Sequence, residues 1–352
     1  MPQPPLSLEK YLSTSLPSVK ENFPAGGGAT GARESFEGNL KSISVIPDFE
    51  AKVQQFVDAL PTQPLVAHPG HPFPHFLNVV RELPSQVKNA QDVQKYLKQI
   101  PLAAVSASLT ALKGTEEGID YSKIGGKAPV GRSGRLLDAA GYESDGAEEL
   151  EEADAQAAPA SKSANAREGT LYGWRFSKSP LAPSSVLAGS GEFLLVDESK
   201  PEEVKLVVRT INSSAFSEDD WKELVVDGAY DYNIKSKASW YWSRKYGATK
   251  RLGCNYFVFT DYQKWCFGVF TDGHSHANIS PVMSFDAGKD GKSPSVLEAL
   301  LYWTRSALGE KNGFKPTVKD VSSKHPYGET YQPRKKAASG QVEASNESDI
   351  EE

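Results

Sequence analysis

Hydrophobic positions fall into short, dense clusters in the C-terminal half of the chain. The segments EFLLVD (192–197) and VKLVVRTIN (204–212) are β-branched and bounded by turn residues, which predicts two strands. The segments 256–261 and 265–273 have the same texture and predict a hairpin. Between the two pairs we expect helix over much of 218–251. This order of elements predicts an α/β domain.

The stretch after the hairpin predicts a short strand and a final helix. PVMSFDA is the candidate strand, and SPSVLEALLYWTRSALGE has the period of a helix that Ser293 or Ser295 can cap. The positions expected to share the buried face of this helix are Leu297, Leu300, Leu301, Thr304 and Leu308. We therefore place the α/β domain at 171–318 and expect a disordered polar tail over 319–352.

The N-terminal half is broken by proline, glycine and polar runs. Residues 1–40 predict a flexible arm, and 41–114 predict a small helical region. In that region IPDFEAKVQQFVDAL can begin at Asp48, and DVQKYLKQIPLAAVSASLTALKG predicts one helix or two helices broken at Pro101. Residues 115–170 contain an acidic run and a small-residue tract, which predicts a disordered linker.

Net charge and cysteine content limit the partners and the cellular compartment that can be expected. The 352-residue chain has a formal net charge of −6, so contact with nucleic acid would need a local basic face. The N-terminus has no apolar signal segment, and no apolar run approaches the about 18 residues that cross a bilayer. Cys254 and Cys266 are expected to be reduced, buried thiols. We therefore expect an intracellular protein, cytoplasmic or nuclear rather than secreted, with no membrane contact.

The segment YGATKRLGCNYFVFTDYQKWCFGVF gives the chain its one family resemblance. It resembles the PD-(D/E)XK nuclease superfamily, in which a helix ends in a small-residue turn before a strand closing in Thr-Asp or Thr-Asn. The nearest likeness is to the restriction-endonuclease-like domains of type I restriction subunits and of many fungal proteins of unknown role. The matching stretch covers roughly 185–310. The resemblance implies a mixed sheet flanked by helices.

The resemblance also implies a place for a metal site, and this sequence departs from the pattern there. Members of the superfamily hold Mg²⁺ with an acid on one strand and a Glu/Asp-x-Lys on the next. Glu192 aligns with the acid, whereas Arg209 and Ile211 stand where the second carboxylate and the lysine should be. Arginine cannot bind Mg²⁺ and isoleucine cannot replace lysine, so we expect a degenerate site without metal or cofactor. Arg209 is expected to pair with Glu192 or with a phosphate.

A second alignment to the family pattern retains a complete set of metal-binding residues. Glu203-Val204-Lys205 is itself a Glu-x-Lys, and with Glu192 it could form the Mg²⁺ site of an active nuclease. It begins a strand directly after Pro201, where solvated turn residues are the competing interpretation.

A basic and aromatic segment precedes the hairpin. Such a surface can hold phosphates and stack on bases, and the candidate nucleic-acid-binding residues are Lys235, Lys237, Trp240, Arg244, Lys245, Lys250 and Arg251. The competing interpretation is a helix whose aromatic face is core and whose lysines are solvated.

The sequence leaves three functions open. The preferred one is a catalytically inactive nuclease-like domain that binds nucleic acid or a protein. The alternatives are an active metal-dependent nuclease using Glu192, Glu203 and Lys205, and a protein-interaction scaffold without nucleic-acid contact. The identity of the partner and the oligomeric state stay undecided at this point.

Overall fold

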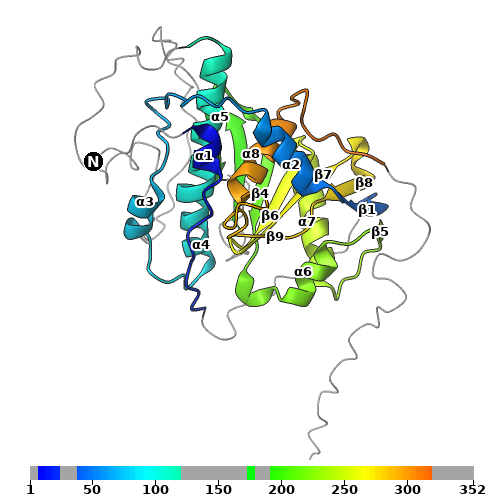
Figure 1. Ribbon diagram of the computed structural model, residues 1–352. Coiled ribbons are helices and arrows are strands. Elements are labelled where there is room, and N and C mark those ends of the chain that lie inside the picture. The colour runs from blue at the N-terminus through cyan, green and yellow to red at the C-terminus, as the bar shows by residue number, and fades with distance from the viewer. Residues whose placement is uncertain (1–6, 24–37, 120–172, 179–190, 319–352) are drawn as a thin grey trace, which may run out of the picture.

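A computed structural model describes residues 7–23, 38–119, 173–178 and 191–318 (Figure 1). Nearly all of the expected linker at 115–170 and the whole expected tail at 319–352 lie outside these ranges. Within the described residues no helix is both long enough and apolar enough to cross a membrane.

One mixed β-sheet forms the centre of the molecule. Its strands, in spatial order, are β2 (Trp174–Lys178), β3 (Glu192–Asp197), β4 (Lys200–Thr210), β6 (Tyr256–Thr260), β7 (Lys264–Phe270), β8 (His276–Ile279), β1 (Ser42–Val45) and β5 (Gly228–Ala229). A ninth strand, β9 (Met283–Ser284), pairs with β7. β2, β3 and β4 form an antiparallel meander, whereas β4 pairs with β6 and β1 pairs with β8 in parallel. The expectation of an α/β fold with a mixed sheet flanked by helices is confirmed.

Helices cover both faces of the sheet. One face is covered by α1 (Leu8–Leu12), α2 (Phe49–Asp58), α4 (Ala90–Leu97), α5 (Ala103–Glu116) and α8 (Val296–Ala307). The other face is covered by α6 (Glu218–Leu224) and α7 (Lys237–Leu252). The short α3 (Phe76–Glu82) buries none of its residues, and it lies at the margin of the molecule (Figure 1).

Alternation along the strands divides the core into two layers. In β3, Phe193 and Leu195 face the α2–α8 layer, while Leu194 and Val196 face the α6–α7 layer. Trp303 of α8 is fully buried, and its indole N–H donates to the Phe257 and Gly268 carbonyls. The central strands are therefore buried on both faces, which explains their continuous hydrophobic runs.

Several expected elements are confirmed. The strands at 192–197 and 204–212 correspond to β3 and β4, and the hairpin corresponds to β6 and β7. Ser295 rather than Ser293 caps α8, because its Oγ accepts the Glu298 N–H at 3.1 Å while the Glu298 carboxylate accepts the Ser295 N–H at 2.7 Å. α2 begins directly after Asp48, whose carboxylate pairs with Lys52 at 2.9 Å and makes no side-chain cap.

Helix covers much of 218–251 as expected, but it forms two helices rather than one long helix. α6 ends at Leu224 and α7 begins after Ser236, and the segment between them contains β5. Ser217 and Ser236 each accept a backbone N–H at the start of a new helix, so local capping favours two helices. By contrast, Pro101 does not interrupt the helical chain. It lies in a π-helical turn (Lys98–Leu102) that joins α4 directly to α5.

The N-terminal half differs most from the expectation. The 41–114 region is not a separate helical unit, because β1 joins the sheet beside β8 and α5 packs against β2 and α8. Residues 7–23, expected within a flexible arm, contribute the buried side chains Leu8, Leu12 and Leu16 to the core. Elements as short as α1 and β1 show little hydrophobic periodicity, so their structure depends on tertiary packing rather than on a local sequence pattern.

Candidate functional site

Three charged side chains meet inside the α6–α7 layer. The Glu192 Oε1 atom lies 2.9 Å from the Arg209 Nη1 atom and 3.3 Å from the Lys245 Nζ atom. Glu192 is 9% exposed, Arg209 is 5% exposed and Lys245 is fully buried. We call these three residues the charge cluster.

Strand register accounts for two members of the cluster. Glu192 opens β3 and is directly opposite Arg209 near the end of the antiparallel strand β4. Both side chains point to the face that α7 covers, and α7 supplies Lys245 from its third turn. Arg209 also lies over the Tyr241 ring at 5.5 Å, and Lys245 lies over the Phe259 ring at 5.6 Å. Aromatic rings therefore share the stabilisation of the two cations.

The cluster holds its charges in a protein interior. Burial alone would raise the pKa of Glu192, but Lys245 and Arg209 together lower it to about 2. Burial lowers the pKa of Lys245 to about 8, with Arg209 acting in the same direction and Glu192 against it. At neutral pH the cluster thus contains one carboxylate and two cations and has a net positive charge.

The three residues expected at the degenerate site lie at the adjoining ends of β3 and β4. Arg209 occupies the position opposite Glu192, and Ile211 is fully buried among apolar side chains two residues further along. The expected ion pair between Glu192 and Arg209 is present. Within the described ranges no group of three or more His, Cys, Asp or Glu side chains could hold a metal ion.

The structure does not bring Glu203 and Lys205 to Glu192. Both residues lie in the exposed first half of β4 and pair with each other at 2.8 Å. Along an extended strand, Glu203 is roughly 20 Å and Lys205 roughly 13 Å from Arg209, so neither residue reaches the cluster. The three residues proposed for an active nuclease therefore do not form one site.

The candidate nucleic-acid-binding residues on α7 separate into several groups. Lys245 belongs to the buried cluster, and the Lys237 Nζ donates to the Ala215 carbonyl at 2.6 Å and to Asp220 at 3.2 Å. Arg244 lies over the half-buried Trp240 ring at 5.0 Å. Lys235, Lys250 and Arg251 are exposed. The aromatic rings of Tyr241, Trp242 and Tyr246 are buried, as the core interpretation of this helix expected.

Acidic groups accompany the first half of α7. The neighbouring helix α6 carries Glu218, Asp219, Asp220 and Glu223, and it packs against α7. Glu223 accepts from the Ser236 hydroxyl at 2.9 Å, and Asp220 pairs with Lys237. The surface formed by α6 and α7 therefore carries both signs of charge rather than a continuous basic stripe.

Sequence reasoning missed the role of Lys245. The sequence analysis treated this lysine as a surface cation, whereas its side chain points from α7 into the core. The available signal was its position three residues after Trp242 and four after Tyr241, on a face otherwise filled by buried aromatic residues. A second residue passed over is Asp261, which is buried after β6 and whose pKa burial raises to about 6.

Comparison of the chain with protein-family models, curated proteins and solved structures finds no match.

Acid should weaken the protein through Glu192. The carboxyl has an ordinary pKa of 4.5 and a folded pKa of about 2, so the folded state binds fewer protons between these values. Its contribution, about 3 kcal/mol, is complete above pH 4.5 and is lost as the pH falls toward 2. Urea unfolding from pH 7 to pH 3 should show the wild type losing its stability advantage over Glu192→Gln. An advantage that stays constant over this range would contradict the assignment.

Proposed function

We propose that this chain is a nuclease-like protein that lacks the metal-dependent reaction and acts by binding a protein partner. The proposal rests on the resemblance of 185–310 to the PD-(D/E)XK superfamily together with the charge cluster. It also keeps the expectation of an intracellular setting.

The observation that supports the loss of catalysis is the pairing of Glu192 with Arg209 and Lys245. A magnesium site needs carboxylate oxygens that face an open position. Here the carboxylate accepts from two cations at 2.9 Å and 3.3 Å, and an arginine stands where the second acid would be. A divalent cation in this place would have to displace two buried positive charges.

The mixed charge of the α6–α7 surface favours a protein partner. Nucleic-acid affinity grows with the number of phosphates that lysine and arginine side chains neutralise. Lys237 and Lys245 are engaged inside the protein, and the acidic side chains of α6 lie beside the same helix. A surface with both signs of charge suits the polar rim of a protein interface.

One observation favours nucleic acid as a second candidate. Arg244 lies over the half-buried Trp240, and Lys250 and Arg251 are exposed on the last turn of the same helix. A guanidinium stacked on an indole can also stack on a base, and the two cations can contact phosphates.

A nuclease assay with binding recorded in the same samples tests the proposal. We expect no cleavage of single- or double-stranded DNA with Mg²⁺ or Mn²⁺, because the carboxylate of Glu192 is already held by Arg209 and Lys245. We also expect no nucleic-acid binding at physiological salt, because in the described part of the chain the α6–α7 surface offers few cations for phosphate contacts. Gel-resolved products and fluorescence anisotropy measure the two outcomes.

The control is Glu203→Ala, which changes an exposed residue of the alternative site. Metal-dependent cleavage that this variant abolishes would restore the active-nuclease alternative. Salt-sensitive binding that weakens in Arg244→Ala would establish the second candidate in place of a protein partner.

A further inference from the structure

A long cleft crosses the face of the molecule opposite α7. A cavity of about 550 Å³ lies between α2, α8 and the segment 312–317, and a second cavity of about 460 Å³ continues from it. The two share Phe56, Ala59, Tyr302, Asn312 and Gly313 as lining residues. Each volume falls within the range of small-molecule sites in proteins.

The wall formed by 312–317 is fixed in place. The Phe314 N–H donates to the Ser306 hydroxyl at 2.8 Å, and the Phe314 carbonyl accepts from the Tyr256 hydroxyl at 2.6 Å. The Phe314 ring lies 5.4 Å from the Trp303 ring. A ligand would therefore meet a largely preformed cleft and would not have to order this segment.

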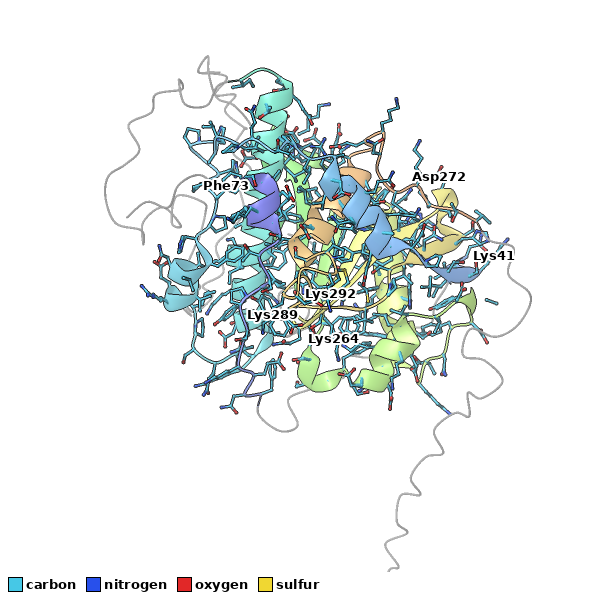
Figure 2. The ribbon with its side chains drawn as sticks, viewed as in Figure 1. Lys41, Phe73, Lys264, Asp272, Lys289 and Lys292 are labelled. Carbon is cyan, nitrogen blue, oxygen red and sulfur yellow. The ribbon has the colours of Figure 1, made fainter. Side chains whose placement is uncertain are left out.

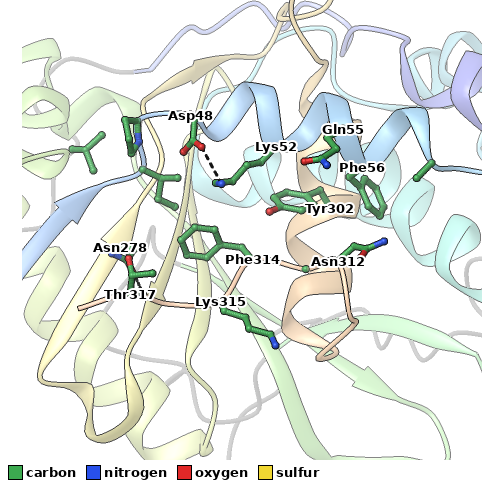
Figure 3. A pocket seen from close by; sticks show the side chains of 15 residues that line it. Asp48, Lys52, Gln55, Phe56, Asn278, Tyr302, Asn312, Phe314, Lys315 and Thr317 are labelled. Carbon is green, nitrogen blue, oxygen red and sulfur yellow. Dashed lines mark hydrogen bonds and ion pairs between the residues drawn. The ribbon is translucent and has the colours of Figure 1, made fainter. Parts of the chain in front are cut away.

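Planar amides surround the first cavity. Gln55 extends from α2, Asn312 comes from the opposite wall, and Asn278 lies at the end of the cavity near β1 (Figure 3). Asn278 is 3% exposed, and its Oδ1 accepts the Thr317 N–H at 2.8 Å. That bond fixes the amide and leaves its Nδ2 group to donate elsewhere. Each amide side chain can donate and accept at once.

Most charges along the cleft are paired, and the two remaining cations, Lys311 and Lys315, are exposed. Asp48 and Lys52 lie 2.9 Å apart at one end, and Arg305 pairs with Glu116 and Glu310 at the other. The Lys315 side chain extends away from α2 (Figure 3). Neither an anion nor a cation would find an uncompensated partner deep in this cleft, so the lining suits a ligand without net charge.

We propose that this cleft binds a neutral sugar, with the first cavity holding one ring of a short oligosaccharide. Sugar hydroxyls both donate and accept, as the amides of Gln55, Asn278 and Asn312 do. The C–H faces of a sugar ring can contact the apolar surface of Phe56 and Tyr302. This inference goes beyond the proposed function and does not depend on it.

Saturation-transfer NMR on the full chain tests the proposal with three trisaccharides: maltotriose, cellotriose and triacetylchitotriose. At least one is expected to bind. Gln55→Ala and Asn312→Ala should each weaken binding roughly three- to ten-fold, the effect of one lost hydrogen bond. Both residues are exposed, so the variants should fold, and the melting temperature verifies this.

Two control variants match these substitutions. Gln54→Ala changes the adjacent glutamine of α2, which does not line either cavity, and Lys292→Glu changes an exposed turn before α8 (Figure 2). Both should bind as the wild type does. The proposal is overturned if no trisaccharide binds at millimolar concentration, or if Gln55→Ala and Gln54→Ala bind equally well. Binding of adenosine in place of the sugars would also overturn it.

Discussion

Replacing Glu192 by glutamine is expected to destabilise the protein by about 3 to 5 kcal/mol at neutral pH. The substitution keeps the size of the side chain and removes the one negative charge of the cluster. Arg209 and Lys245 then remain buried, at 5% and 0% exposure, without the carboxylate that both of them contact. Urea-induced unfolding, followed by tryptophan fluorescence, measures the change in the free energy of unfolding.

The matched variant is Lys245→Met, which removes the second cation and leaves the ion pair between Glu192 and Arg209 in place. A buried lysine whose pKa falls to about 8 already carries a desolvation cost. We therefore expect this variant to be neutral or more stable, and the double variant to recover part of the loss in Glu192→Gln. A similar loss in both single variants would show that packing, rather than charge balance, holds the cluster.

Truncating Leu12 to alanine is expected to cost about 2 to 5 kcal/mol of stability. Leu12 is fully buried in the core that α8 completes, and its carbonyl accepts the Ser295 hydroxyl at 2.6 Å. The cost is that of a cavity in a packed interior. The shift in the urea midpoint at constant slope measures it.

Lys10→Ala is the control for this variant, since Lys10 lies in the same short helix and is exposed. It should leave the urea midpoint unchanged. A neutral Leu12→Ala variant would instead support the flexible arm that the sequence predicted for residues 1–40.

The sequence predicted correctly those helices and strands whose own residues carry a clear hydrophobic pattern. β3, β6 and β7 are continuous apolar runs, and α8 has both a capping box and a buried face, so each could be recognised from its own residues. β1 has four residues and α1 has five, too few for a period to be distinguished from chance. Their structure depends on partners more than 200 residues away, which local pattern does not contain.

The residues of the candidate site also differ in how far the sequence could place them. The resemblance suggested that Arg209 could pair with Glu192, and the two residues are opposite each other in β3 and β4. The exact register could not be derived from the sequence, because the pairing contains an irregularity near Val196. Lys245 escaped prediction because its burial depends on how α7 is rotated against the sheet. Glu203 and Lys205 match the Glu-x-Lys motif but lie toward the exposed end of β4. The motif fixes the spacing of these two residues in the sequence, but not their distance in space from Glu192.

The contact between Leu12 and Ser295 links residues 283 positions apart, and it has a consequence for synthesis. A ribosome adding about 5 to 20 residues each second needs roughly 15 to 60 seconds to cover that interval. During this time Leu8, Leu12 and Leu16 have emerged while α8, which completes their binding surface, has not been made. The nascent chain therefore presents these leucines before their native partners in α8 exist, and this segment is where a chaperone would be expected to bind.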